Sequence, residues 1–364
     1  MSYLNSNYSP TITGTTAAKP VALAWQHETV AGTGNLFGTN FDGNATLSVL
    51  VYTSPTGFKL RVNSGGTIST VSLPATINQD RAYWTTLVGT TVFLFIGGWN
   101  TIAEVYRFNL AGVQLSHDTF GSNKANCWPQ AACALASGGF GAFYMENGIG
   151  HLLYRSPAGV WTNTVFTLAG LGGLPCSVMR QHPGNGRVLL LSHWDSSHDV
   201  AQGWFNETAA GFVQDLTLPR VDEALDWERP FLTMIASPQR QSLFLATPDL
   251  NGSWYAVWPD GTRQKGSPVR VREILSDGTG TFWYSQGFME RINTCGLALD
   301  AAGDVLVAYV DFQADGKIGP VWVEGKATRE SLPIGASWSA DAGGLPGHPE
   351  VVTGSPAGLE LYTR

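Results

Sequence analysis

The segment from Ser192 to Gln202 (SHWDSSHDVAQ) is unusually dense in side chains that can do chemistry. These side chains are His193, Trp194, Asp195, His198 and Asp199. Either imidazole could act as a general base held by a neighbouring carboxylate. The two histidines could also converge on a metal ion, although their spacing matches no common metal motif and a further ligand would have to come from elsewhere. Ordinary turn and surface roles are the third interpretation, because Asp and Ser are frequent turn formers.

Two further polar segments add carboxylates and aromatic rings. The segment from Leu218 to Phe231 contains Asp222, Glu223, Asp226, Trp227, Glu228 and Arg229. The segment from Val271 to Cys295, interpreted as the longest connection of the chain, contains Asp277, Trp283, Tyr284, Glu290 and Arg291. Glycoside hydrolysis needs one protonated and one ionised carboxyl group across the scissile bond, so a carboxylate of the second segment could pair with Glu290. Ion pairing between Glu228 and an arginine is the alternative.

The elements that must position these residues form a repeat. Short apolar strands that follow a turn with Gly, Asp or Pro recur about every 52 residues, which is typical of a β-propeller. They begin near Leu47, Val92, Phe140, Val188, Leu243, Val305 and Leu359. After the first six hairpins a third strand carries a large side chain, namely Arg61, Tyr106, Tyr154, Phe205, Trp258 and Trp322. An open sandwich built from the same hairpins is the alternative fold.

The two ends of the chain complement each other. Hairpin seven, Glu350 to Thr363, has no third strand after it, whereas Val21 to His27, with Trp25, matches a third strand that has no hairpin before it. Exchange between the ends would close the ring and leave no unpaired edge. We therefore predict an all-β, seven-bladed propeller over residues 21–364, preceded by an N-terminal arm over residues 1–20. In it, the last blade takes its two inner strands from the C-terminus and its outer strands from the N-terminus.

This strand order predicts where function resides. Connections from second to third strands and from blade to blade emerge on one face, and loops on a rigid scaffold are where binding groups collect. The three polar segments fall in blades four, five and six, so we expect them to crowd one sector of that face. The loop tryptophans there and elsewhere are Trp128, Trp194, Trp227, Trp283 and Trp338. Indoles beside carboxylates suit sugar rings, because the C–H faces of a sugar stack on aromatics. Plugging of the channel mouth is the alternative role.

The composition argues against a nucleic-acid partner, a membrane span and a zinc site. A net charge of −7 disfavours nucleic acid as a partner. No apolar run is long enough to span a membrane, and residues 1–9 lack the pattern of a signal peptide. The four cysteines are Cys127, Cys133, Cys176 and Cys295. We place the last three at the starts of first strands. We interpret all four as buried thiols, because the spacing of Cys127 and Cys133 matches no zinc site. No cofactor is expected.

The blade pattern resembles that of the broad propeller superfold that includes NHL-type and sialidase-like rings. The resemblance covers nearly the whole chain but is generic. The Asp box of sialidase-like proteins is out of register in Ser276 to Trp283 (SDGTGTFW), so no catalytic residue is carried over.

The sequence favours a non-catalytic recognition propeller that binds a glycan or a surface receptor. A phage tail, a capsid decoration or an extracellular adhesin is the expected setting, with the polar arm lying on a neighbouring subunit or on the ring itself. The alternative is a carbohydrate-active hydrolase or lyase that uses the polar segments, and a third possibility is a scaffold unconcerned with sugars.

Overall fold

The computed structural model describes most of the chain. The described residues are 24–30, 41–79, 81–98, 100–122, 127–166, 177–193, 200–219, 233–248, 254–257, 263–289, 295–310, 319–325, 329–337, 339–355 and 358–364.

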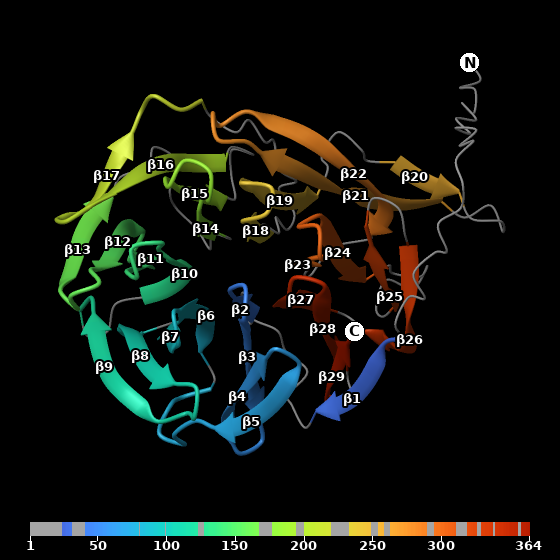
Figure 1. Ribbon diagram of the computed structural model, residues 1–364, viewed down its shortest axis with the longest axis horizontal. Helices are drawn as coiled ribbons and strands as arrows, with labels where there is room; N and C mark the ends of the chain where they lie inside the picture. The colour runs from blue at the N-terminus through green and yellow to red at the C-terminus, as the bar shows by residue number, and fades with distance from the viewer. Residues whose placement is uncertain are drawn as a thin grey trace.

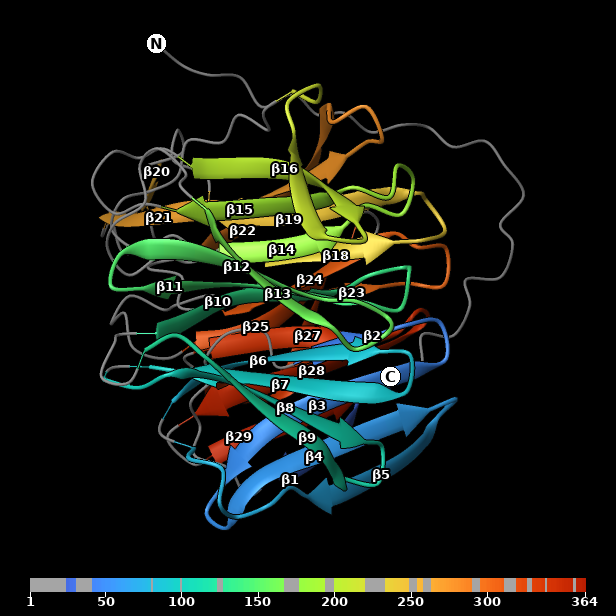
Figure 2. The same ribbon diagram turned by 90° about the vertical axis from the view of Figure 1, so that its left-hand side faces the viewer.

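The described residues form 29 strands and no helix. The strands pair into seven antiparallel sheets, six of four strands and one of five. The seven innermost strands contact one another around a complete circle, and the sheets radiate from it as blades (Figures 1 and 2). The protein is a seven-bladed β-propeller, as the repeat predicts.

Blades one to three follow one plan, with strands running from the centre outwards in chain order. Their strands are β2 (Phe41–Gly43), β3 (Leu47–Ser54), β4 (Gly57–Ser64), β5 (Thr67–Ser72), β6 (Ala82–Val88), β7 (Thr91–Gly97), β8 (Ala103–Asn109), β9 (Gln114–Phe120), β10 (Cys127–Ala134), β11 (Phe140–Glu146), β12 (Ile149–Arg155) and β13 (Trp161–Phe166).

Blades four and six follow the same plan, and blades five and seven vary it. Their strands are β14 (Ser177–Gln181), β15 (Val188–His193), β16 (Val200–Thr208), β17 (Gly211–Asp215), β18 (Thr233–Ser237), β19 (Ser242–Pro248), β20 (Trp254–Val257), β21 (Arg263–Ile274), β22 (Gly280–Met289), β23 (Cys295–Leu299), β24 (Val305–Val310), β25 (Gly319–Glu324), β26 (Arg329–Ser337), β27 (Ser339–Leu345), β28 (His348–Ser355), β29 (Gly358–Thr363) and β1 (Gln26–Val30).

Each layer of the ring has its own side-chain pattern. The second strands are continuous apolar runs because neighbouring blades cover both faces, and β7 is buried along nearly its whole length. The outermost strands, such as β9, alternate between exposed and half-buried residues. The innermost strands β23 and β27 are rich in small residues. A Cβ at Gly296 of β23 would lie 1.9 Å from the backbone nitrogen of Ala342, so only glycine allows blades six and seven to meet this closely.

Exchange between the chain ends closes the ring, with one correction. β1 pairs with β29 from Gln26–Thr363 to Val30–Leu359, so blade seven reads β27, β28, β29, β1. Three strands come from the C-terminus and one from the N-terminus, and Glu350 to Thr363 holds the second and third strands rather than the first two. The innermost strand was missed because its sequence, SADAGGL, lacks a bulky apolar pattern.

Buried charge joins blade seven to blade one. Glu350 of β28 accepts hydrogen bonds from Asn63 Nδ2 at 2.8 Å and from Arg61 Nε at 3.4 Å, both on β4. Arg61 also reaches Glu28 of β1 at 3.2 Å. A single guanidinium thus links the N-terminal strand, the C-terminal hairpin and the first blade.

Blade five departs from the predicted plan. Its third strand is β21, which pairs with β19, with β20 at one end and with β22 at the other. The segment from Ser253 to Gly261, predicted to be the third strand, instead contributes β20, and Trp258 lies outside the described residues. The other predicted third-strand residues, Arg61, Tyr106, Tyr154, Phe205 and Trp322, do lie on third strands.

Three cysteines are described, and all are buried. Cys295 begins β23 as predicted, but Cys133 lies near the end of β10, which Cys127 begins. Cys176 lies outside the described residues. Burial raises the pKa of Cys133 to about 12 and that of Cys127 to about 11. In the part of the chain described here, no helix has the length and apolarity needed to cross a bilayer.

Candidate functional site

The segment from Ser192 to Gln202 is described only at its two ends. His193 is the last residue of β15 and pairs with Val200 of β16, at the end of blade four where second and third strands connect. Trp194, Asp195, His198 and Asp199 lie outside the described residues. Their convergence therefore stays a prediction.

The segment from Leu218 to Phe231 is described only at its first two residues. Asp222, Asp226, Trp227, Glu228 and Arg229 lie outside the described residues. The preceding Pro219 accepts a hydrogen bond from Trp204 Nε1 at 3.1 Å and packs against Gly278 in the β21–β22 turn of blade five. The segment thus starts where blades four and five contact each other.

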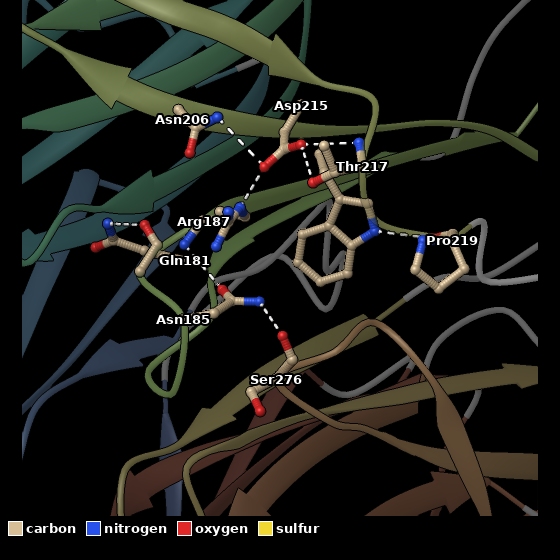
Figure 3. Close-up of polar contacts among 10 residues, drawn as sticks. Gln181, Asn185, Arg187, Asn206, Asp215, Thr217, Pro219 and Ser276 are labelled. Atoms are coloured by element: carbon tan, nitrogen blue, oxygen red, sulfur yellow. Dashed lines mark hydrogen bonds and ion pairs between the residues drawn. The ribbon is translucent and has the colours of Figure 1, made fainter.

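A polar cluster fixes that starting point (Figure 3). Asp215, at the end of β17, accepts hydrogen bonds from the Thr217 hydroxyl at 2.6 Å and the Thr217 amide at 2.9 Å, and from Arg187 Nε. These hydrogen bonds, that of the Thr217 hydroxyl first, hold the pKa of Asp215 far below its usual range. Asn185 Nδ2 donates to the carbonyl of Ser276 at 2.7 Å and so connects blade four to blade five. This cluster fixes the chain at Thr217, just before the segment begins.

The segment from Val271 to Cys295 is mostly strand rather than loop. Trp283 and Tyr284 lie on β22, opposite Val271 and Arg270 of β21. The sequence prediction was wrong because the turn Ser276–Gly280 (SDGTG) was taken as part of a long connection instead of a hairpin turn between two strands. Glu290 and Arg291 lie outside the described residues.

The structure describes a cavity of about 290 Å³ at the other end of the channel. It lies among the turns that join first to second strands, whereas His193 lies at the opposite end of its blade. The polar lining includes Asp42 of β2, Arg180 of β14 and Asp341 of β27. The apolar lining includes Phe41, Met234, Ile235, Leu297, Leu299 and Ala342.

Arg180 lies at the centre of several blades. Its Nη1 donates to the Ala132 carbonyl of blade three at 2.9 Å, and its Nε donates to the Met234 carbonyl of blade five at 3.2 Å. Its Nη2 faces Oδ1 of Asp42, in blade one, at 3.6 Å. One guanidinium on blade four therefore contacts three other blades.

Asp42 is the carboxylate partner of this arginine. Its Oδ2 accepts a hydrogen bond from the Leu87 amide of blade two at 2.7 Å. Burial raises the pKa of Asp42, and the positive charge of Arg180 and the backbone hydrogen bonds oppose that rise. Asp341 accepts a hydrogen bond from the Ala342 amide at 2.9 Å and adds to the burial that raises the pKa of Tyr83.

Sequence reasoning missed this site because its residues form no motif. Asp42, Arg180 and Asp341 come from three distant innermost strands. The usable signal was a single charged residue inside a short strand of otherwise small or apolar residues, as in SVMRQ and SADAGGL. Among the described residues, no cluster of three or more His, Cys, Asp or Glu could hold a metal ion.

Comparison with known proteins supports the fold. No family model matches the sequence, and no curated protein matches it. The BP39L lectin from Burkholderia pseudomallei has a TM-score of 0.58 at 11% identity, covering 90% of this chain and 94% of the lectin. Streptogramin B lyase has a TM-score of 0.54 at 9% identity, covering 93% and 97%. A chain of the mitotic checkpoint complex has a TM-score of 0.52 at 10% identity, covering 98% and 97%.

These three neighbours differ in what their names say they do, and their identities to this chain are low. The likeness therefore shows the propeller fold and not a function.

Proposed function

We propose that this chain is a non-catalytic recognition propeller that binds a glycan or a partner surface. The observation that carries the proposal is the use of carboxylates, buried at Glu350 and half-buried at Glu207, to join blades. Glu350 joins blades seven and one through Arg61. Glu207 of blade four accepts a hydrogen bond from Tyr154 of blade three at 3.2 Å. Such contacts make the ring a rigid platform, and binding groups on loops gain precision from a rigid support.

A glycan is the preferred ligand class. The segment beginning at Leu218 is anchored by Asp215 and Trp204, and it carries an indole, Trp227, among carboxylates. Indoles and carboxylates together can stack on a sugar ring and bind its hydroxyl groups. The likeness in fold to a lectin supports this choice of ligand class.

The proposed setting is the surface of a phage or viral particle, or an extracellular adhesin. The support is compositional: 13% charged residues and a polar segment of about twenty residues before the ring. In this setting the segment would lie on a neighbouring structural subunit.

One observation favours the alternative, a carbohydrate-active hydrolase or lyase. Asp42 and Asp341 line the same cavity, and burial raises the pKa of Asp42. Paired carboxyl groups with different proton affinities are what glycoside hydrolysis requires.

A glycan array combined with an assay for released reducing ends tests both functions on the full chain. We expect binding without release, and weaker binding by Trp227→Ala than by a matched Trp25→Phe variant at the ring closure. Release of reducing ends that Asp42→Asn abolishes would establish the enzyme instead. Absence of binding to every glycan would contradict the glycan proposal.

A further inference from the structure

The channel cavity has one polar side and one apolar side. The ion pair between Asp42 of blade one and Arg180 of blade four bridges the channel. The cavity lies on the side of this bridge formed by blades five, six and seven, because β18, β23 and β27 supply most of its remaining lining. Leu297 and Leu299 of β23 and Met234 of β18 form the apolar wall.

Asp42, Arg180 and Asp341 are the charged residues of the cavity lining. Among the other polar lining residues, Asn44 accepts from the Thr46 and Leu47 amides and donates to the Gly89 carbonyl. Gln181 accepts from the Ala136 amide and donates to the Gly186 carbonyl. These two amide side chains are engaged in turns, whereas Asp42 and Arg180 carry charge that strengthens a hydrogen bond to a ligand.

The two atoms of the pair are farther apart than in a direct charge-assisted hydrogen bond, so a hydroxyl group beside the pair can bind both. Charge-assisted N–H···O bonds are about 2.7–2.9 Å long, whereas Nη2 of Arg180 lies 3.6 Å from Oδ1 of Asp42. A hydroxyl group can donate to the carboxylate oxygen and accept from the guanidinium at the same time. Two adjacent hydroxyl groups can share these roles.

Charge selects against ionic ligands. An anion would face the carboxylates of Asp42 and Asp341, and a cation would share the cavity with the guanidinium of Arg180. Because burial makes an unpaired charge costly, an uncharged ligand fits best. The volume of 290 Å³ lies just below the usual range of small-molecule pockets, about 300–1,000 Å³. A single ring fits it better than a chain of rings.

We propose that the channel cavity binds one neutral, hydroxyl-bearing ring of the size of a pyranose, with its hydroxyl groups on Asp42 and Arg180 and its C–H face on the wall of blades five and six. This site lies at the other end of the channel from His193 and does not depend on glycan binding by the loop face.

Titration of the full chain with methyl glucoside, methyl galactoside, methyl mannoside and methyl fucoside, followed by saturation-transfer NMR and calorimetry, tests the proposal. Glucuronate and glucosamine serve as the charged counterparts. We expect at least one neutral glycoside to bind in the millimolar range and to bind more tightly than both charged sugars. Absence of binding by all four neutral glycosides, or tighter binding of a charged sugar, would overturn the proposal.

Two variants assign the binding to the cavity. Asp42→Asn should weaken it about tenfold, which corresponds to about 1.4 kcal/mol, since the variant replaces a hydrogen bond to a charged group by one to a neutral group. Ala236→Leu, which adds volume to the apolar lining, should abolish it and leaves the ion pair intact in case Asp42→Asn fails to fold. Asp118→Asn, on the outer strand β9, removes the same charge far from the channel and should bind like the natural chain. Unchanged affinity in a folded Asp42→Asn or Ala236→Leu variant would place the ligand elsewhere.

Discussion

Blades six and seven meet at the centre of the ring through close backbone packing, whereas blades seven and one are joined farther out by buried charge. At the first seam, a Cβ on Gly296 would approach the Ala342 nitrogen to 1.9 Å. At the second, the Glu350 side chain is 3% exposed and is bound by Arg61 and Asn63. The first seam therefore tolerates no added volume, and the second tolerates no loss of a charged partner.

The largest expected effect is at the charged seam. Replacing Glu350 by Ala leaves Arg61 buried without its inner partner, and breaking a buried pair in this way costs about 3–5 kcal/mol of unfolding free energy. Urea denaturation of the purified variant measures this loss. Glu330→Ala is the matched control, because Glu330 pairs with Arg364 but is 32% exposed, and exposed pairs contribute about 0–1 kcal/mol. Equal losses in both variants would contradict the contrast.

The packed seam gives a smaller effect by a different mechanism. Gly296→Ala forces β23 and β27 apart, and overpacking of this kind costs about 1–3 kcal/mol. Gly98→Ala is the control, since the nearest atoms to a Cβ there lie at 3.9 Å. Thermal unfolding should separate the two variants clearly. A Gly296→Ala protein as stable as the natural chain would show that β23 and β27 can move apart without loss of stability.

The sequence predicts the second strands of the blades better than the first strands. The apolar second strands, such as β7, repeat clearly enough to predict seven blades and closure by the chain ends. The first strand of blade seven, β27, carries small residues for close packing and lacks a hydrophobic signal. The prediction therefore missed it and assigned the next two strands as the first two. Blade five was misassigned because its extra strand β20 interrupts the repeat.

The candidate site was harder to predict than the fold. Asp42 and Arg180 are far apart in the sequence, and only the ring brings their innermost strands together across the channel. The loop residues predicted from their chemistry, from His193 to Arg291, lie mostly outside the described residues or, as with Trp283, on a strand.

A third contact between blades responds to pH. His182 is fully buried, with Nε2 3.0 Å from the Ile274 carbonyl and Nδ1 accepting from the Gly184 amide at 3.0 Å. Burial lowers its pKa, so at mildly acidic pH the unfolded chain binds a proton that the folded chain does not. Stability from this group is present above the ordinary histidine pKa of about 6.5 and is lost as pH falls below it.

Urea midpoints at pH 7.5 and pH 5 test this effect. The natural chain should lose stability at the lower pH, and His182→Gln should show a smaller loss between the same two conditions. This is the smallest of the expected effects, because one group contributes. An identical pH dependence in the variant would mean that other groups control it.

The exchange of strands between the chain ends is the feature on which the ring, its seams and its channel cavity all depend. Gln26 of β1 lies opposite Thr363 of β29, so the double variant Gln26→Cys, Thr363→Cys measures that pairing directly by oxidation and mass spectrometry. Cys127 and Cys133, whose pKa values are raised to about 11 and about 12, should not compete for the new thiols. The account predicts an intramolecular disulfide between residues 26 and 363 in the folded monomer. Disulfide-linked dimers, or two free thiols after oxidation of the folded protein, would contradict it.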